Sequence, residues 1–420
     1  MFFLQKIIYD LFIRATVLGA WVGRFFSKKA KNWLDSRKNW RKNLQKRGQK
    51  TAPTLWMHCA SLGEFEQGRP VLEAFRKKFP EWKIALTFFS NSGFEPRKNW
   101  PGADLIAVLP ADTPANARDF QALLQPDLAI FVKYEFWANH LFALKKRGTP
   151  AILISADFRK NQPFFHPFGG FWRRMLSCFD HVFVQNQTSA DLLRSVGFEK
   201  TTVAGDTRID RVLNIAEEAK RLPIVDFFLE NKPALICGST WEADEKVLSP
   251  ILQQLDNQWF KCIVAPHELS EATFLRLEKT FPQPVARYSS GQIAGANTLI
   301  IDNIGLLSAI YFYGKIAFIG GGFGAGIHNT LEPAAFGLPV IFGPRFEKFE
   351  EARQLVESGG FFSVKNESEL QSVLKKLENS DFYQKTSEIV VDFLSKNRGA
   401  TGVILDFLEK MNHRRSQSKP

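Results

Sequence analysis

The sequence predicts an α/β protein made of two Rossmann-type units. From residue 51 onward, short apolar runs of strand length alternate with amphipathic helical stretches, a pattern typical of a parallel sheet covered on both faces. The same pattern starts again at Pro233. A chain of 420 residues also exceeds what one hydrophobic core usually supports, so two folded domains are expected.

The first unit is expected over residues 51–212, after a separate N-terminal segment of residues 1–50. Apolar runs predict its strands at Thr54–Cys59, Ile84–Phe88, Leu105–Leu109, Leu128–Lys133, Ala151–Ser155 and Val182–Gln185. The helices expected between them include Phe65–Lys78, Pro114–Leu124 and Trp137–Arg147.

The second unit is expected over residues 233–395, followed by a C-terminal helix and tail at 396–420. Its predicted strands are Ala234–Cys237, Cys262–Ala265, Thr298–Ile301, Ile316–Ile319 and Val340–Phe342. A polar helical stretch at 213–232, broken by Pro223, is the expected hinge. Ligands of such sheets bind outside the carboxyl ends of the strands. Two facing units would therefore place a reaction in a central cleft.

Composition narrows the class of protein. The chain is 45% hydrophobic and 23% charged, which excludes intrinsic disorder, a collagen-like fibre and a polytopic membrane protein. The cysteines at 59, 178, 237 and 262 have no C-x-x-C spacing, so neither a disulfide framework nor a cysteine zinc site is expected. The seven histidines also lack paired-ligand spacing, and we predict no metal.

The net charge of +12 is concentrated at one end of the chain. Residues 24–50 hold eleven Lys and Arg against the single Asp35. A nucleic-acid enzyme usually spreads basic residues over its binding face, so we expect no nucleic-acid partner. A local basic block instead indicates an anionic surface met near the N-terminus.

Residues 1–23 are typical of a membrane-associated helix. Lys6, Asp10 and Arg14 recur at every fourth position and form one narrow polar stripe, with apolar residues around the rest. The longest uncharged run, Ala15–Gly23, is well short of the roughly 20 apolar residues that span a bilayer. An interfacial or re-entrant anchor is therefore favoured. In the following basic block, Trp33 and Trp40 favour the membrane interface; a solvated basic helix packed on the protein is the alternative.

A first candidate site follows the strand that ends at Cys59. The small loop Ser61-Leu62-Gly63 leads into a helix that opens near Glu64, so backbone N–H groups could meet an anionic substrate. Glu64 would project from the strand end, where partial burial suits a general base. A purely structural role, in which Glu64 or Glu66 complements the helix dipole, stays open.

Two further charged residues stand at similar points in the first unit. Glu135 follows an apolar strand, and it is either a site residue or a carboxylate at a helix N-terminus. Arg208 lies where the first domain ends. Its guanidinium can bind a phosphate or carboxylate bidentately, or it can pair with Asp210 or another acid at a domain interface.

The segment from Gly320 to Glu332 is the most informative in the second unit. A strand enters five glycines, among them Gly321 and Gly322, which permit close backbone approach to a phosphate. Glu332 falls in the first turn of the next helix, where its carboxylate suits ribose hydroxyls. The spacing also fits a dinucleotide fingerprint, but no acid follows at the next strand end, so an NAD site is disfavoured.

Two smaller segments of the second unit also lie at strand ends. Ser239 and Thr240 stand between a strand and a helix, an arrangement suited to an anion. Ala265-Pro266-His267 ends the next strand. Each segment alone is a weak signal, but their occurrence at successive strand ends strengthens both.

Taken in order, these segments resemble the 3-deoxy-D-manno-octulosonic acid (Kdo) transferases of Gram-negative bacteria. The resemblance rests on the N-terminal anchor, HCASLGEFEQGRPVLEAF, VKYEFWAN, SADFR, QN at 185–186, GDTRID, GSTWEADE, APHE, IDNIGLLSAIYFYGKIAFIGGGF and GIHNTLEPAAFGLPVIFGP. It implies a GT-B glycosyltransferase that transfers Kdo from CMP-Kdo to a lipid A precursor, with inversion and without a metal or other cofactor. It also implies a location at the cytoplasmic face of the inner membrane, beside anionic lipids.

The resemblance assigns roles to individual residues. Glu64 matches the catalytic base, and Glu135 and Arg208 match positions that stabilise the transition state. Nucleotide contacts map to Ala265, Pro266, Ile304, Gly305, Leu306, Asn329, Thr330, Leu331 and Glu332. Three positions depart from the usual pattern: Arg208 replaces a lysine, Ala265-Pro266 replaces Pro-Arg, and Leu306 replaces a glutamate.

Other functions remain compatible with the same pattern. A soluble nucleotide-sugar epimerase or another GT-B glycosyltransferase would also show two Rossmann-type units. A lipid-binding scaffold without activity would need no special role for Glu64. The predicted anchor speaks against the soluble alternatives.

Overall fold

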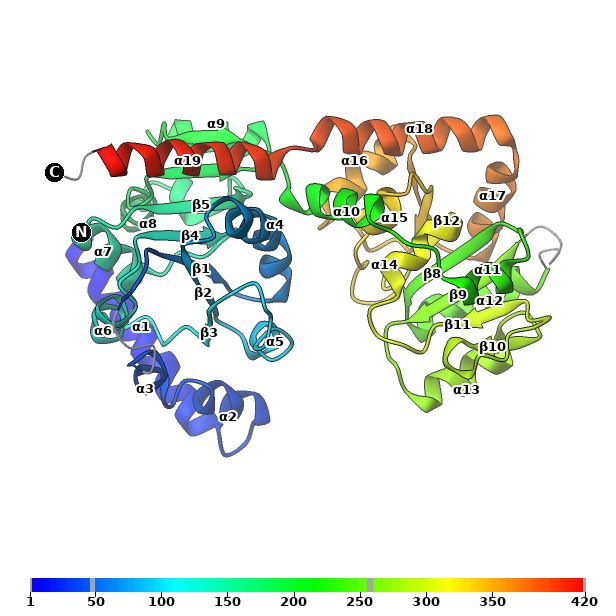
Figure 1. The fold of residues 1–420 in the computed structure, drawn as a ribbon, viewed down its shortest axis with the longest axis horizontal. Helices are drawn as coiled ribbons and strands as arrows, with labels where there is room; N and C mark the ends of the chain where they lie inside the picture. Colours follow the sequence, from blue (N-terminus) through cyan, green and yellow to red (C-terminus); the bar gives the residue numbers. More distant parts are fainter. Residues whose placement is uncertain (1, 46–49, 255–259, 418–420) are drawn as a thin grey trace. The chain divides into compact units, whose positions relative to one another are not determined.

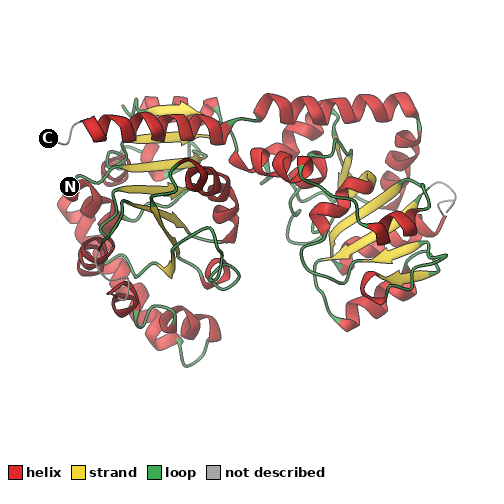
Figure 2. Cartoon of the chain, in the orientation of Figure 1, coloured by secondary structure: helices red, strands yellow, loops and turns green. Residues whose placement is uncertain are grey.

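The computed structural model describes residues 2–45, 50–254 and 260–417, with side chains up to residue 414. The chain forms two compact units (Figure 1). Unit 1 comprises residues 1–210 and 399–420, and unit 2 comprises residues 211–398. Each unit contains one parallel seven-stranded sheet with helices against it (Figure 2), which confirms the predicted α/β class.

The sheet of unit 1 has the strand order β3-β2-β1-β4-β5-β6-β7. Its strands are β1 Thr54–Cys59, β2 Lys83–Phe88, β3 Leu105–Val108, β4 Leu128–Val132, β5 Ala151–Ala156, β6 His181–Val184 and β7 Thr201–Val203. The central strands β1, β4 and β5 are buried along their whole length, as parallel strands covered on both faces must be. The strand order reverses between β1 and β4, which become neighbours although β2 and β3 separate them in the chain.

Helices cover both faces of this sheet. They are α1 Phe2–Gly23, α2 Lys28–Asp35, α3 Trp40–Gln45, α4 Leu62–Lys78, α5 Asn91–Phe94, α6 Pro114–Leu124, α7 Ala138–Arg147, α8 Gly170–Leu176, α9 Gln187–Ser195 and α19 Ala400–Gln417. One core cluster joins α3 and α6–α9 to the sheet, and a second joins α4 and α19 to it. Helix α19 therefore belongs to the core of unit 1 although it ends the chain.

The sheet of unit 2 has the order β10-β11-β9-β8-β12-β13-β14. Its strands are β8 Ala234–Thr240, β9 Lys261–Pro266, β10 Val285–Arg287, β11 Thr298–Ile300, β12 Gly314–Ile319, β13 Val340–Phe342 and β14 Phe361–Ser363. Its helices are α10 Thr207–Glu217, which starts in unit 1, α11 Pro223–Leu229, α12 Glu242–Gln254, α13 Glu271–Thr280, α14 Leu307–Ile310, α15 Leu331–Ala334, α16 Glu350–Ser358, α17 Glu367–Glu378 and α18 Ser380–Asn397. Here the strand order reverses between β8 and β12.

Three strands were not predicted from the sequence: β7, β10 and β14. Each has only three residues and forms an edge of its sheet. An edge strand makes hydrogen bonds on one side only and is less buried, so its residues need no continuous apolar run. This absence of an apolar run explains why these strands were missed.

The structure divides the chain differently from the predicted domain boundaries. Of the expected hinge at 213–232, Pro223–Leu229 form α11, whose Val225 and Phe228 are buried in unit 2. The C-terminal segment expected at 396–420 is also not separate, because α19 packs on unit 1 through Ile404 and Leu408. A hinge within residues 213–232 stays a prediction.

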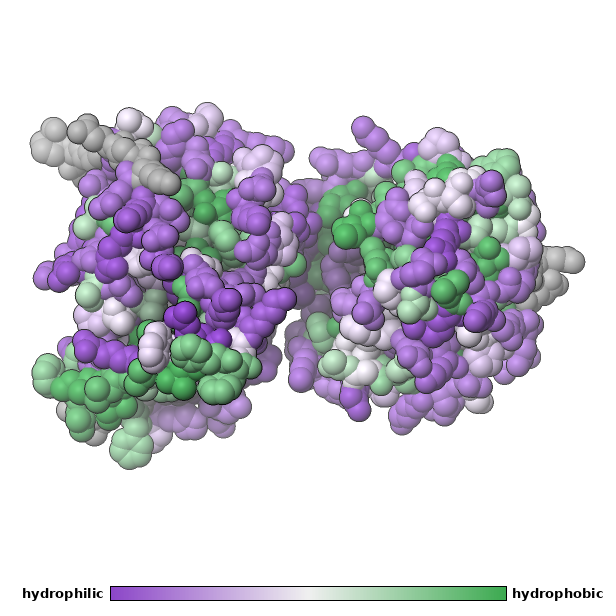
Figure 3. Space-filling model, turned by 90° about the horizontal axis from the view of Figure 1, so that it is seen from below, coloured by the Kyte–Doolittle hydropathy of each residue, from purple (hydrophilic) through white to green (hydrophobic). Residues whose placement is uncertain are grey.

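Helix α1 turns Lys6 and Asp10 of its polar stripe toward the protein, whereas Arg14 is exposed. The Nζ atom of Lys6 lies 2.6 Å from Asp10 Oδ2 and 2.7 Å from Asn139 Oδ1, and the hydroxyl of Tyr9 donates to Asp112 over 2.6 Å. Its large apolar side chains are exposed instead, by between 40 and 76%: Phe3, Leu4, Ile7, Ile8, Leu11, Phe12, Leu18, Trp21 and Val22. Figure 3 shows a continuous hydrophobic area on one face of unit 1.

The basic block after α1 is partly packed on unit 1. Trp40 is buried against Phe120, so the prediction that Trp40 lies at a membrane interface is wrong. Arg37 is also buried, and its guanidinium stacks 4.0 Å from the ring of Trp33. The lysines at 28, 29, 31, 38 and 42 are exposed. Within the described residues, we find no helix of sufficient length and apolar character to cross a bilayer.

His140, on α7, is a fully buried titratable group of unit 1. Its side chain is fully buried against Trp56 and Phe120, and neither ring nitrogen has a hydrogen-bond partner among the described residues. The nearest carboxylate oxygen, on Asp112, is 3.9 Å away and too distant for a hydrogen bond. Burial, and secondarily the charge of His58, lowers the pKa of His140 from 6.5 to about 3.

We predict that replacing His140 makes unit 1 more resistant to acid. The unfolded chain binds a proton at His140 below pH 6.5, whereas the folded chain does not bind it until about pH 3. Stability is therefore lost as the pH falls through this window, by about 2 kcal/mol between pH 6.5 and pH 5. Urea unfolding of wild type and His140→Leu at both pH values should show a smaller loss in the variant. An equal loss in both proteins would contradict the prediction.

Candidate active site

The candidate site in unit 1 lies at the carboxyl ends of β1 and β4, where the strand order reverses. In open parallel sheets, ligands bind at this kind of switch point. Cys59 ends β1 and α4 starts three residues later, while Val132 ends β4 and is followed by Lys133, Tyr134 and Glu135. The sheet register therefore brings the Glu64 and Glu135 segments to one edge.

Glu64 is half-buried in the first turn of α4. Ser61 is the N-cap residue, but its side chain does not cap the helix; its hydroxyl donates to Oε2 of Glu64 instead. The reciprocal pattern of a capping box, in which the serine oxygen accepts the N–H three residues on, is not formed. The alternative, purely structural role of Glu64 is thus limited to a favourable interaction of its carboxylate with the dipole of α4.

Buried groups next to β1 respond to both carboxylates. Burial raises the pKa of the Cys59 thiol well above its usual value, and the charges of Glu64, Glu135 and Glu66 raise it further. The pKa of Tyr134 rises to about 12, first through burial and Asp157, with a smaller contribution from Glu64. These shifts indicate that Glu64 and Glu135 lie close enough to act on the same surroundings.

Glu135 is almost completely buried and held by two ring nitrogens. Its Oε2 accepts from Nε1 of Trp137 over 2.6 Å and lies 3.0 Å from Nε2 of His58. The backbone just before it is unusual, because Lys133 has a φ of +66°, which non-glycine residues seldom adopt. Such strain is typical of functional sites.

Arg208 pairs with a neighbour in its own loop. Its Nε and Nη2 atoms lie 2.9 and 2.6 Å from Oδ2 of Asp206, whereas Asp210 accepts the backbone N–H groups of Gly399 and Thr401. The prediction left open a pair with Asp210 or another acid, and the acid paired with Arg208 here is Asp206. The adjacent Thr207 donates to the carbonyl of Gln67 on α4, which ties the Arg208 loop to the helix that carries Glu64.

The candidate site in unit 2 lies where its own strand order reverses, at the ends of β8 and β12. The glycines after β12 are required by backbone packing. A Cβ atom on Gly320 would lie 2.3 Å from the carbonyl oxygen of Ser239, and one on Gly322 would lie 2.5 Å from the amide of Gly343. Gly321 has a φ of +92°, a conformation that favours glycine.

The amides of this loop already hold a carboxylate. Asp244, in the first turn of α12, accepts the N–H groups of Gly321, Phe323 and Trp241 over 2.8, 3.3 and 2.9 Å. From the sequence, Gly321 and Gly322 were expected to let a phosphate approach such amides closely. Because the N–H of Gly321 points to Asp244, a phosphate contact at this amide would require Asp244 to move.

A polar cluster joins two of the predicted nucleotide segments. Oε2 of Glu332 accepts from the hydroxyl of Ser308 over 2.7 Å, and Oε1 accepts from the side-chain amide of Asn329 over 2.9 Å. Ser308 lies directly after the loop Ile304–Leu306, in which Ile304 is 91% exposed. The structure thus brings the 304–306 loop next to Asn329 and Glu332, as a shared nucleotide site requires.

Three aromatic side chains that were not predicted as site residues form a stacked cluster after the strands of unit 2. Trp241, His267 and His328 follow β8, β9 and β12. Nε1 of Trp241 donates to Nε2 of His328 over 2.9 Å, and the two rings are inclined by only 14°, so they lie nearly in one plane. His267 stacks on both rings with centroids 4.4 Å apart. In the sequence, this cluster is marked by an aromatic residue after each of three strands.

The other predicted residues of unit 2 are less accessible. Thr240 is buried and its hydroxyl donates to Glu245 over 3.2 Å, while Ala265 and Pro266 are buried at the end of β9. Thr330 and Leu331 are buried as well. Ser239 is partly exposed and has a φ of +54°. Side-chain contacts with a ligand are thus more accessible to Ser239, Ile304, Asn329 and Glu332 than to these buried residues.

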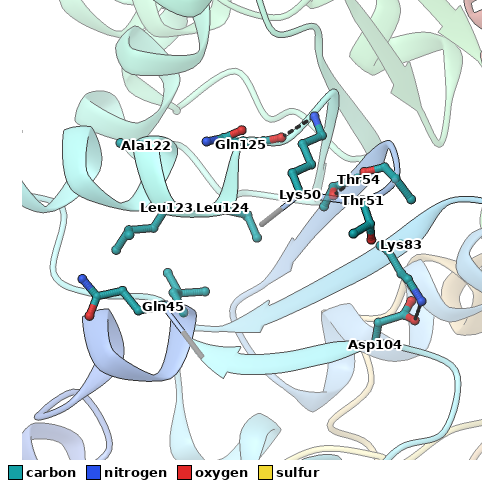
Figure 4. Close-up of a pocket in the computed structure, with 12 residues that line it drawn as sticks. Gln45, Lys50, Thr51, Thr54, Lys83, Asp104, Ala122, Leu123, Leu124 and Gln125 are labelled. Carbon is teal, nitrogen blue, oxygen red and sulfur yellow. Dashed lines mark hydrogen bonds and ion pairs between the residues drawn. The ribbon is translucent and has the colours of Figure 1, made fainter. Parts of the chain in front are cut away.

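A cavity of about 830 Å³ lies elsewhere, at the amino ends of the strands of unit 1 (Figure 4). Its lining includes Thr54 and Lys83, the first residues of β1 and β2, and Asp104, which precedes β3. Lys50 and Lys83 are paired with Asp127 and Asp104. The cavity is therefore separate from Glu64 and Glu135, which follow the opposite ends of the strands.

Comparison with solved structures defines the class of fold. The UDP-GlcNAc 2-epimerase from Neisseria meningitidis has a TM-score of 0.60 at 16% identity, covering 85% of this chain and all of that one. A glycosyltransferase from Rickettsia africae has a TM-score of 0.54 at 12% identity, covering 86% of this chain and 99% of that one. These similarities establish a GT-B-type fold.

Sequence comparison is more specific. A family model described as 3-deoxy-D-manno-octulosonic-acid transferase matches residues 36–211. The 3-deoxy-D-manno-octulosonic acid transferase of Aquifex aeolicus is 27% identical, covering 82% of this chain and 92% of the relative, and that of Haemophilus influenzae is 27% identical, covering 84 and 86%. The chain is therefore an enzyme of the glycosyltransferase class. It is a homologue of the Kdo transferases, which confirms the resemblance predicted from its motifs.

We predict that Asp244 is needed to hold the glycine loop. In Asp244→Asn, an amide NH₂ group faces backbone N–H groups that now donate to a carboxylate, which should cost unit 2 about 1–3 kcal/mol. Thermal unfolding and hydrogen exchange at the Gly321 amide would measure this effect. The control is Glu242→Gln in the same helical turn, where the carboxylate pairs only with the exposed Lys246. Equal unfolding of both variants would refute a structural role for Asp244.

Proposed function

We propose that this enzyme transfers Kdo from CMP-Kdo to a lipid A precursor, with inversion, at the cytoplasmic face of the inner membrane. The observation that carries this proposal is the half-buried Glu64 carboxylate, which follows β1 at the switch point of the unit 1 sheet while Glu135 follows the neighbouring β4, in a homologue of the Kdo transferases. A half-buried carboxylate at such a position suits a general base.

In the proposed reaction, Glu64 accepts the proton of an acceptor hydroxyl while that oxygen attacks the anomeric carbon of Kdo. The bond from this carbon to the phosphate oxygen breaks, and CMP leaves with the electron pair. A single displacement inverts the anomeric configuration. The hydroxyl of Ser61, which donates to Oε2 of Glu64, restricts the rotation of the carboxylate and favours proton acceptance at Oε1.

Unit 2 would bind the nucleotide. Glu332, held by Ser308 and Asn329, has carboxylate oxygens suited to ribose hydroxyls, and the exposed loop at Ile304 offers backbone groups for the base. Ser239, with the partly exposed start of α12, is the candidate for the phosphate. Arg208 would stabilise developing negative charge, and Asp206 keeps its guanidinium oriented until then.

The acceptor would be reached at a lipid surface. Helix α1 exposes its apolar side chains while Lys6 and Asp10 bind the protein, and the lysines at 28, 29, 31, 38 and 42 are exposed on the following segment. Apolar side chains that enter a bilayer and lysines near anionic headgroups both favour membrane binding. This exposed face argues against a soluble epimerase.

We predict that Glu64→Gln loses transfer activity by a factor of about 10²–10⁴, because the amide cannot accept the proton. The assay is release of CMP and formation of a Kdo-bearing lipid from CMP-Kdo and a lipid A precursor. The control is Glu73→Gln on the same helix, where an exposed carboxylate pairs with Arg69. Full activity of Glu64→Gln would eliminate Glu64 as the base, and an inactive wild type would favour another glycosyltransferase activity or a scaffold.

We also predict that α1 binds membranes through its exposed leucines. Leu4, Leu11 and Leu18 are each 61–62% exposed and repeat every seven residues, so they lie on one side of the helix. Replacing all three with Gln should weaken binding to phosphatidylglycerol-containing vesicles at least a hundredfold, since each leucine contributes about 1.5–3 kcal/mol when buried. Vesicle co-sedimentation would measure this loss.

The control for the membrane experiment is Val403→Gln, which replaces an exposed apolar residue on α19 of the same unit. Circular dichroism should show that both variants keep the helical content of wild type. Unchanged vesicle binding by the triple variant would remove α1 as the anchor.

A further inference from the structure

A buried chain of hydrogen bonds runs from the sheet of unit 1 to Glu135. Nε1 of Trp56 lies 2.8 Å from the hydroxyl oxygen of Thr87, which lies 2.8 Å from Nδ1 of His58. Nε2 of His58 lies 3.0 Å from Oε2 of Glu135. Trp56, Thr87 and His58 are each fully buried, so these contacts are not exchanged with water.

Donor and acceptor chemistry fixes the direction of this chain. An indole N–H can only donate, so Trp56 donates to the Thr87 oxygen. The single hydroxyl proton of Thr87 then goes to Nδ1 of His58, because its other neighbour, the carbonyl of Met57, is 3.5 Å away. Nδ1 therefore accepts, and the proton of the neutral imidazole is on Nε2.

The opposite tautomer, with the proton on Nδ1, is disfavoured by the contacts of Nε2. In that tautomer the Nε2 lone pair could accept from Nε1 of Trp137, 3.0 Å away, but this indole N–H makes a shorter contact, 2.6 Å, with Oε2 of Glu135. The lone pair would also lie 3.0 Å from the same carboxylate oxygen, and the Thr87 hydroxyl would have only the Met57 carbonyl, 3.5 Å away. With the proton on Nε2, His58 and Trp137 both donate to Oε2 of Glu135. Among the described residues, neither of these two bonds uses Oε1, which remains the oxygen for a ligand.

We infer that His58 is a positioning residue, which Thr87 and Trp56 hold with its proton on Nε2, so that its N–H donates to Oε2 of Glu135 and leaves Oε1 for the substrate. The inference rests on the proposed function, because it assigns Glu135 a part in transfer. His58 itself touches no reacting atom. Its effect is on the turnover number, since two N–H donors keep the Glu135 carboxylate in one orientation.

The chain offers a matched control for this role. His140 is also fully buried, and it packs against the same Trp56 ring, with centroids 5.6 Å apart, compared with 6.4 Å for His58. Unlike His58, it has no hydrogen-bond partner among the described residues. Replacing either histidine with leucine removes a buried ring, but only one replacement removes a donor to Glu135.

The kinetic test compares three variants of the full chain in the CMP-Kdo assay. His58→Leu should lower kcat about tenfold or more, with the KM for CMP-Kdo within a factor of two of wild type. His140→Leu should keep the wild-type kcat. His58→Gln, whose side-chain amide can still donate to Glu135, should recover kcat to within about threefold. Equal kcat values for His58→Leu and His140→Leu, in proteins with normal thermal unfolding, would overturn the inference.

The spectroscopic test needs no variant to be active. In protein labelled with ¹⁵N-histidine, the signals that disappear in His58→Gln identify His58, and proton–nitrogen couplings show which nitrogen is protonated. We expect a proton on Nε2 alone. A proton on Nδ1 alone, or on both nitrogens, would overturn the inference even if wild type transfers Kdo. A wild type that transfers no Kdo would instead overturn the proposed function, and the role of His58 with it.

Discussion

The structure depends on one constraint: strands that are buried on both faces have no room for polar side chains except at their ends. In both sheets the central strands are apolar along nearly their whole length, so polar residues collect where a strand gives way to a loop. At two points, between β1 and β4 and between β8 and β12, the chain leaves in opposite directions. The loops diverge there and leave a surface that a ligand can reach.

The polar groups at the two switch points find their hydrogen-bond partners in different ways. In unit 2, Asp244 satisfies the amides of the glycine loop, so the tight backbone approach of Gly320 and Gly322 is stabilised without a ligand. In unit 1, the side chains of His58 and Trp137 satisfy Glu135. In unit 1 the protein thus holds the carboxylate of Glu135 in position. In unit 2 the carboxylate of Asp244 instead accepts the backbone N–H groups that were predicted to bind a phosphate.

A feature of the fold or site could be predicted where neighbouring residues in the sequence mark it. The run Pro114–Leu124 was predicted as it occurs, because proline and the hydrophobic period mark its ends. Glu64 and Glu135 were identified because strand ends are visible in the sequence. Asp244 and the Trp241–His328 plane were not, because their partners lie 77 and 87 residues away and depend on sheet order. The three-residue edge strands lacked any periodic signal.

Helix α1 shows that the sequence alone does not determine which face of an amphipathic helix packs against the protein. From the sequence, its three charges suggested a polar stripe beside an apolar body, and the direction of each face was open. Because Lys6 and Asp10 bind Asn139 on α7, and Tyr9 binds Asp112, two of the three charges face unit 1, while Arg14 is exposed. The apolar side chains are then left outside, an arrangement that water alone does not favour. Under the proposed function, a lipid surface would resolve this cost, and it is also where the lipid acceptor would be found.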